Sequence, residues 1–269
     1  MQAGSAHSLD AVLECVDQAL ETGVDPTSLG DELFAVVLIL DSRHSLRRAL
    51  TEPAVPADAK STLWHTLVEG KISEGTIGVV DAAVRRRWSQ GRDLADALER
   101  ASVTAHVVHA DRNGHLDDLE DNLFRFGRIL EAQPELRDVL SDLEAPAEGK
   151  REILHSLLQG KVAKSTEHLL GQAVAGRHRS LFSTMSTYQR IAADRRDRLV
   201  ATVWVATPLS ENHKQRLARA LAAQYSHEVH INVIVDPQVL GGVRVAVGND
   251  VIDSTVETRL AKAHRGIAP

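Results

Sequence analysis

Cysteine is almost absent from this chain of 269 residues, since Cys15 is its only one. An intramolecular disulfide and a cysteine-ligated zinc site are therefore excluded. Aromatic side chains are also scarce, at 3% of the residues, whereas 43% are hydrophobic and are mostly Leu, Val and Ala. This composition favours packed helices over a β-sandwich.

The chain has no excess of basic residues and no long hydrophobic run. Its formal net charge of −6 gives no support to nucleic-acid binding. An apolar run such as Phe34–Leu40 is far too short to span a bilayer, and no N-terminal stretch has a basic flank followed by an apolar core. We therefore expect a cytoplasmic protein without direct membrane insertion, which reaches a membrane only through a partner.

An internal repeat organises the first two thirds of the chain. Residues 46–71 align without a gap on residues 136–161, and ten of the 26 positions are identical. The same offset of 90 residues pairs Phe34 with Phe124 and Ile39 with Ile129 further upstream. A duplicated module is the simplest interpretation. The identical pairs are Leu46/Leu136, Arg47/Arg137, Leu50/Leu140, Pro56/Pro146, Ala57/Ala147, Lys60/Lys150, His65/His155, Leu67/Leu157, Gly70/Gly160 and Lys71/Lys161.

Each copy is predicted to consist of short helices, because its apolar residues recur at helical spacing. In the first copy the predicted helices are 5–22, a segment with Leu33 and Leu40 inward, 45–50, 56–67 and 73–88. In the second copy they are 117–132, 135–140, 147–158 and 164–177.

One helix is expected to serve both copies. The offset places the counterpart of residues 5–22 at 95–112, inside a long helical segment over 93–111. That helix would be the last helix of the first bundle and the first helix of the second. Its predicted inward residues are Leu94, Leu98, Ala101, Ala105 and Val108.

The periodicity changes after a helical segment at 182–198. Residues 199–206 alternate and are rich in Val, which predicts a strand. Ser210 can cap a helix that ends at Tyr225. The predicted buried residues of that helix are Leu217, Ala220 and Leu221.

Two further strands follow, with alternate residues on one face. These residues are Val229, Ile231, Val233 and Val235 in one strand and Val243, Val245 and Val247 in the next. Asp236-Pro237 predicts a turn between them, and Gly241-Gly242 permits backbone angles that a side chain would forbid. Ser254 with Glu257 matches a capping box for a last helix.

The sequence therefore predicts a mainly α fold. Two tandem helical bundles, formed by a duplicated six-helix-type module that can share one helix, precede a small α+β module. The order in that module is strand-helix-strand-strand-helix. The predicted boundaries are 1–94 for the first bundle, 95–198 for the second and 199–269 for the C-terminal module.

Thirteen histidines raise the question of a metal site. His106, His109 and His115 lie near one helix end, without carboxylates at ligand spacing on the same stripe. His227 and His230 lie at the entry to a strand, where alternation directs them to opposite faces. We therefore expect no metal site.

Catalytic motifs are missing as well. Gly241-Gly242 lacks the Lys-Ser/Thr of a phosphate loop and precedes a strand, which favours a tight turn. Cys15 lies in the middle of a predicted helix without an activating neighbour. Adjacent carboxylates such as Asp117 and Asp118 point apart on a helix. We expect neither a catalytic residue nor a cofactor.

The segment from Asp236 to Leu260 resembles the C-terminal signature of the δ subunit of bacterial F-type ATP synthases, called the oligomycin-sensitivity-conferring protein in mitochondria. In this family an Asp-Pro turn precedes a strand-turn-strand with paired glycines, and an Ile/Val-Asp-Gly/Ser-Ser/Thr segment then opens a helix. Ala246 stands where a charged or amide residue is frequent, and Ser254 where Gly is frequent. The motif positions are held by Asp236, Pro237, Gly241, Gly242, Gly248, Asp253 and Thr255.

The helical copies also resemble the N-terminal six-helix domain of this family, of which a usual member has one. The chain is therefore similar to the longer actinobacterial form, in which 95–269 corresponds to an ordinary δ subunit and 1–94 is the extra copy. This resemblance implies a non-catalytic subunit of the peripheral stalk, or stator. Such a subunit joins the catalytic head to the membrane b subunits and resists the torque of rotation during proton-driven ATP synthesis.

The resemblance also implies a set of partners. These are the N-terminal helices of the α subunits, the β subunits and the b subunits, in a hetero-oligomer that is peripheral on the cytoplasmic face of the cell membrane. We further predict a groove for an α-subunit helix between the first and fifth helices of the second copy. Its candidate lining residues, each also a candidate for the bundle core, are Ala105, Val108, Leu169 and Val174.

Two other hypotheses belong to different classes of protein. A free helical-repeat scaffold or regulatory protein would have no affinity for the ATP synthase. A hydrolase would need a pocket of converging ionisable groups, for which the sequence offers no constellation.

Overall fold

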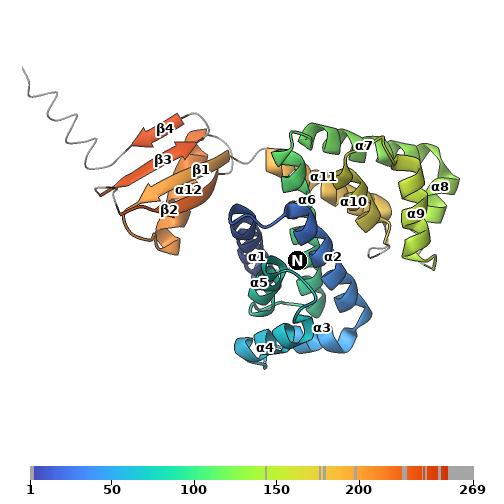
Figure 1. Cartoon of the computed structure of the whole chain (residues 1–269), viewed down its shortest axis with the longest axis horizontal. Coiled ribbons are helices and arrows are strands. Elements are labelled where there is room, and N and C mark those ends of the chain that lie inside the picture. Colours follow the sequence, from blue (N-terminus) through green and yellow to red (C-terminus); the bar gives the residue numbers. More distant parts are fainter. Residues whose placement is uncertain are drawn as a thin grey trace, which may run out of the picture. The chain divides into compact units, whose positions relative to one another are not determined.

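The computed structural model describes residues 3–253, except for 143, 176, 178–179, 197–198, 226–228, 238, 240 and 248–249 (Figure 1). The chain divides into two units, Met1–Ala193 and Asp194–Pro269. The first unit is helical and the second combines helix and sheet, so the predicted fold class is confirmed. Among the described residues, no helix combines the length and the apolarity that crossing a bilayer requires.

The first helical module begins with five helices, which are α1 (Ala3–Glu21), α2 (Pro26–Ser42), α3 (His44–Thr51), α4 (Ala57–Val68) and α5 (Glu74–Val84). The start of α2 is fixed by Asp25, whose carboxylate accepts a hydrogen bond from the Ser28 backbone N–H at 2.8 Å. The end of α5 differs from the prediction. Trp88 is buried, but it lies beyond the helix, and its indole N–H donates to the Ala83 carbonyl at 3.0 Å.

The second helical module repeats α2–α5 in α7 (Leu116–Ala132), α8 (Pro134–Ser141), α9 (Ala147–Leu158) and α10 (Lys164–Ala173), and ends with α11 (Leu181–Arg196), whose start lies 90 residues after that of α6 (Gly91–Arg112), the helix that is first in this module. An offset of 90 residues superimposes the bounds of α2 on α7, of α3 on α8 and of α4 on α9, residue for residue. The duplication inferred from the sequence is therefore also a duplication of structure. As in the first copy, the fifth helix is shorter than predicted, because α10 ends at Ala173 and not at residue 177.

A single long helix, α6 (Gly91–Arg112), belongs to both modules. All five residues predicted to face inward pack in the core of the first module. Another face of α6 supplies Val103, Val107 and Ala110 to the core of the second module. The shared helix is thus confirmed, and it is buried on two faces.

The second unit contains β1 (Leu199–Val205), α12 (Glu211–Tyr225), β2 (Val229–Val235), β3 (Val243–Val247) and β4 (Asp250–Asp253). The sheet order is β2-β1-β3-β4, in which β1 pairs with β2 in parallel and with β3 antiparallel. A parallel pair needs a crossover connection, which α12 provides. The strand β4 was not predicted, and the predicted helix from Ser254 onward lies outside the described residues.

Alternate side chains of β1, β2 and β3 form the core of this unit with Leu221 of α12. The predicted inward faces of the strands are largely confirmed, although Val235 at the end of β2 is exposed. The prediction for Ala220 is wrong: it is exposed, and Ala218 and Ala222 pack against the core instead. Gly241 and Gly242 have φ angles of 63° and 83°. The prediction that both adopt backbone angles unfavourable for residues with a side chain is therefore confirmed.

Close packing in the first unit depends on Gly30. The Gly30 carbonyl accepts a hydrogen bond from the Ser102 hydroxyl at 2.6 Å, which draws α2 against α6. A Cβ atom at Gly30 would lie 2.5 Å from Nε2 of the buried His106. At that distance α2, α6 or the imidazole would have to move.

We expect Gly30→Ala to lower the free energy of unfolding of the full chain, because overpacking a core costs about 1–3 kcal/mol. The matched control is Gly78→Ala in α5, where a Cβ atom meets no atom of the described residues within 4 Å. That variant should gain about 0.5–1 kcal/mol from helix propensity alone. Urea unfolding followed by circular dichroism measures both. Equal or greater stability of Gly30→Ala than of wild type would show that the close approach is not required.

Candidate docking groove and inter-module seam

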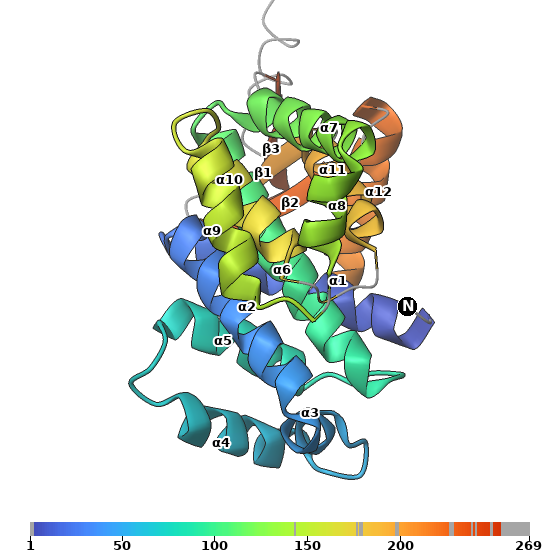
Figure 2. The same ribbon diagram turned by 90° about the vertical axis from the view of Figure 1, so that its right-hand side faces the viewer.

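The two helical modules meet where α2 and α10 lie against α6 and against one another, as Figure 2 shows from the side. Ser102 of α6 contacts both neighbours: its hydroxyl donates to the Gly30 carbonyl of α2, and it accepts from the Gln172 amide of α10 at 3.0 Å. We call this three-helix junction the inter-module seam. Because α2 of the first module covers α6 and α10 here, the first module packs directly against the second.

Arg177, which follows α10, closes one end of the seam. Its guanidinium donates to Asp41 and to Asp96, at 2.6 Å each, and also to Glu99. Glu99 in turn accepts from the Tyr188 hydroxyl at 2.8 Å. Burial alone would lower the pKa of Arg177, but the surrounding carboxylates raise it. Burial and the neighbouring Glu99 raise the pKa of Tyr188 well above its usual range. The arginine is therefore charged and ties together α2, α6 and the chain after α10.

The same seam contains a second group of ionisable side chains, apart from the Arg177 cluster. His168 Nδ1 of α10 lies 2.7 Å from Asp31 Oδ1 of α2, and His106 Nε2 of α6 lies 3.4 Å from the same oxygen. His106 is fully buried, and within the described part of the chain neither of its ring nitrogens makes a well-formed hydrogen bond; Nε2 makes only this long contact with Asp31. Within the part of the chain that the structure describes, these three side chains are the group whose donor atoms could hold a metal ion.

The protonation of this group follows from its surroundings. Burial lowers the pKa of His106, which is therefore neutral. The hydrogen bond to Asp31 raises the pKa of His168. Burial alone would raise the pKa of Asp31, but the two imidazoles beside it outweigh that effect and hold the pKa well below its usual range.

The other histidines considered from the sequence do not join this group. His109 contacts Thr27, with Nδ1 3.2 Å from the hydroxyl, and His115 pairs with Asp118 at the surface. His230 lies in β2, and His227 lies outside the described residues. Asp31 and His168 were missed because they come from other helices, far from His106 in the sequence.

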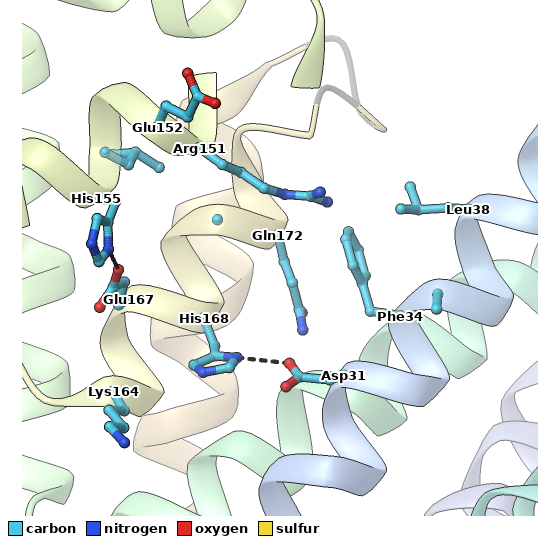
Figure 3. A pocket seen from close by; sticks show the side chains of 13 residues that line it. Asp31, Phe34, Leu38, Arg151, Glu152, His155, Lys164, Glu167, His168 and Gln172 are labelled. Atoms are coloured by element: carbon cyan, nitrogen blue, oxygen red, sulfur yellow. Dashed lines mark hydrogen bonds and ion pairs between the residues drawn. The ribbon is translucent and has the colours of Figure 1, made fainter. Parts of the chain in front are cut away.

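A cavity of about 770 Å³ opens beside Asp31 and His168, between α2 on one side and α9 and α10 on the other (Figure 3). Its lining is mixed, with Phe34 and Leu38 facing charged side chains such as Arg151 and Glu167. His155 Nδ1 lies 2.5 Å from Glu167 Oε1 on its wall, and this contact is separate from the His168–Asp31 pair (Figure 3). Two of the three donor side chains therefore border open space.

A second hollow, of about 340 Å³, lies among α7, α8, α9 and α10. We call it the α7–α9 groove. Its ionisable lining residues, Arg125 and Lys161, are both basic. Its apolar lining residues are Phe126, Ile129, Leu136, Leu157, Leu158, Val162 and Leu170.

Apolar side chains in this groove are exposed at positions that the repeat duplicates. Leu157 is 40% exposed and its counterpart Leu67 is 38% exposed, and Ile129 and Ile39 form a second exposed pair. A solvated surface does not require large apolar side chains at the same positions of two copies. Clustered exposed apolar residues instead mark an interaction site.

The structure places the residues predicted from the sequence as follows. Asp236 follows β2 directly and donates its backbone N–H to the Val205 carbonyl at 2.9 Å, and Pro237 follows in the turn. Gly241 and Gly242 precede β3, and Asp253 ends β4. Gly248 and Thr255 lie outside the described residues.

The four candidate groove residues are all buried. Ala105 and Val108 pack in the core of the first module, and Leu169 and Val174 pack in the core of the second. The structure does not bring these four together on one open surface, because α6 directs the first two toward the other module. Binding of a partner helix there stays a prediction.

Comparisons with known proteins extend over the whole chain. The family model described as the ATP synthase delta (OSCP) subunit matches residues 101–267. The ATP synthase subunit delta of Streptomyces griseus is 44% identical over 270 residues, which cover 100% of both chains. The proteins of the same name from Streptomyces avermitilis and Thermobifida fusca are 45% and 41% identical. These two alignments cover 99% and 100% of this chain and 96% and 100% of the relatives.

Proposed function

The chain belongs to the ATP synthase delta (OSCP) subunit family, and on this basis we propose that it is a non-catalytic subunit of the peripheral stalk of a bacterial F-type ATP synthase. In this role it joins the catalytic head to the b subunits and keeps the head fixed while the rotor turns. It would be bound peripherally on the cytoplasmic face of the cell membrane. The observation that carries the proposal is the family match over residues 101–267, extended to the full chain by the relatives.

The long form with a duplicated helical module, inferred from the sequence, agrees with these relatives from actinobacteria, which are as long as this chain. We propose that residues 1–94 are the extra module, 95–198 the usual N-terminal domain and 199–269 the module that attaches to the b subunits. The family match begins at residue 101, inside α6, and therefore leaves out the first module.

We place the head contact in the α7–α9 groove, in the part of the chain that the family match covers. An amphipathic helix docks by inserting apolar side chains into such a groove. The N-terminal helix of an α subunit is the proposed occupant. Because Arg125 and Lys161 are the ionisable lining residues, acidic residues on that helix would complement them.

The groove predicted between α6 and α10, at Ala105, Val108, Leu169 and Val174, remains a second proposed location. An occupant there would have to displace α2, which already lies against both helices.

Replacement of Leu157 with glutamate tests the α7–α9 groove. We expect Leu157→Glu to weaken binding of the full chain to the purified catalytic head by about 30-fold, the effect of losing about 2 kcal/mol at a hot spot. The matched control is Leu67→Glu, the same substitution at the duplicated position with nearly the same exposure. We expect it to bind as wild type does. Surface plasmon resonance measures both, and circular dichroism verifies that both fold.

The possible outcomes distinguish an error in the proposed function from an error in the proposed binding surface. Failure of the wild-type chain to bind the head would overturn the stalk assignment and favour a free helical scaffold or regulator. Wild-type binding with equal losses in both variants would overturn only the choice of the second module.

A further inference from the structure

We propose that Asp31, His106 and His168 form a binding site for a divalent transition-metal ion, with Zn²⁺ as the expected occupant. The three residues belong to α2, α6 and α10, so the ion would join the two helical modules across their seam. Two imidazoles and one carboxylate are a donor set that suits zinc. The proposal does not depend on the stalk function.

The distances fit a small tetrahedral ion. Bonds of about 2.0–2.1 Å in tetrahedral geometry place the ligand atoms about 3.3 Å apart. Asp31 Oδ1 lies 3.4 Å from His106 Nε2 and 2.7 Å from His168 Nδ1, and all three donor atoms lie within 4.8 Å of one another. Only a small rotation of Asp31 and His168 is needed. Both side chains are partly exposed, at 46% and 32%, so neither is enclosed on all sides by the core.

The buried His106 is an independent indication. Among the described residues Nδ1 has no hydrogen-bond partner and Nε2 has only the long 3.4 Å contact with Asp31, and a buried polar group that is poorly satisfied costs free energy. A metal ion would give one of these nitrogens its partner. The ring is also held in place, since it lies so close to Gly30 that no side chain could replace the glycine hydrogen.

The cavity beside the group leaves room for a fourth ligand. Asp31 and His168 both line it. Three protein ligands with one open position is the pattern of zinc sites that also bind water or an external group. The fourth ligand here would be water or a carboxylate entering from the cavity.

A purely structural explanation is the competing one. In that case the His168–Asp31 hydrogen bond would hold the modules together, and His106 would be a neutral core residue. The two explanations differ in whether the side chains bind a metal at all.

Calorimetric titration of the metal-free full chain with Zn²⁺ tests the proposal, with Co²⁺ as a spectroscopic probe of coordination. We expect one ion per chain and the visible absorption of tetrahedral Co²⁺. Because His106 is in the core, His106→Asn can fail to fold. The test therefore relies on the zinc affinities of His168→Asn and Asp31→Asn. Each should weaken binding by more than about tenfold, at least as much as loss of an outer-shell partner does.

The control is His155→Asn, which changes an exposed histidine of the same cavity outside the group of three. It should bind Zn²⁺ as wild type does. Zinc should also raise the thermal midpoint of wild type but not of His168→Asn, because only the wild type gains binding free energy in its folded state. Absence of binding, unchanged affinity in His168→Asn or an equal loss in His155→Asn would overturn the site.

Discussion

Replacement of Arg177 with methionine is expected to lower the free energy of unfolding of the full chain by about 3–5 kcal/mol, the cost of removing one partner from a buried ion pair. Arg177 is 2% exposed and donates to carboxylates on two helices. Its removal would leave the buried Glu99 beside Asp96 without the guanidinium between them. Asp41 is less affected, because Arg47 lies 3.2 Å from it on its other side.

Arg125→Met is the matched control, since it removes the same side chain from a surface pair. Arg125 lies 3.1 Å from Asp121, but both are well exposed, at 72% and 66%. Surface pairs contribute about 0–1 kcal/mol. Urea unfolding followed by the helical circular dichroism signal measures both variants. A similar small loss in the two would show that the Arg177 cluster does not hold the modules together.

A conservative variant separates charge from geometry at this site. Arg177→Lys keeps the positive charge but lacks the planar fork that reaches several carboxylates at once. Its stability should lie between those of wild type and of Arg177→Met.

The local parts of the fold could be predicted from the sequence, because their signals are local. Proline and glycine punctuation, helical spacing and the 90-residue repeat were sufficient to predict the helices and the shared helix α6. The fifth helix of each copy was predicted too long. The apolar pattern continues through Trp88 and Val174, which are buried but lie beyond the ends of the helices. Such a pattern detects burial and not the end of backbone hydrogen bonding.

The contacts between the modules could not be predicted in this way. The seam joins residues such as Asp31 and His168, which no sequence spacing relates. The repeat does not reveal them either, because the positions equivalent to His168 and His106 are Gly78 and Arg196. A contact that occurs at the junction of two copies is absent from the repeating pattern.

The parallel pairing in the C-terminal module has a signal in the sequence. A helix between two strands favours a crossover and hence a parallel pair. The segment from Leu199 to Val235 has this order, and β1 and β2 are indeed parallel, with β1 between β2 and β3. The strand β4 is short and has no clear alternation, which explains why it was not predicted.

The largest functional effect is expected from omission of the whole chain. If it is the stalk subunit proposed here, the catalytic head and the b subunits have no stable complex without it. Contacts at both ends of one chain raise the effective concentration of each partner for the other. Leu157→Glu should then lose the head from the assembly while it keeps the b subunits.

Mass photometry of three purified components tests the proposed stalk function: the catalytic head, the soluble part of the b subunits and this full chain. A stalk subunit should give a complex of all three when the chain is present and separate head and b particles when it is omitted. Head and b particles that associate equally well without the chain, or a chain that binds neither, would contradict it.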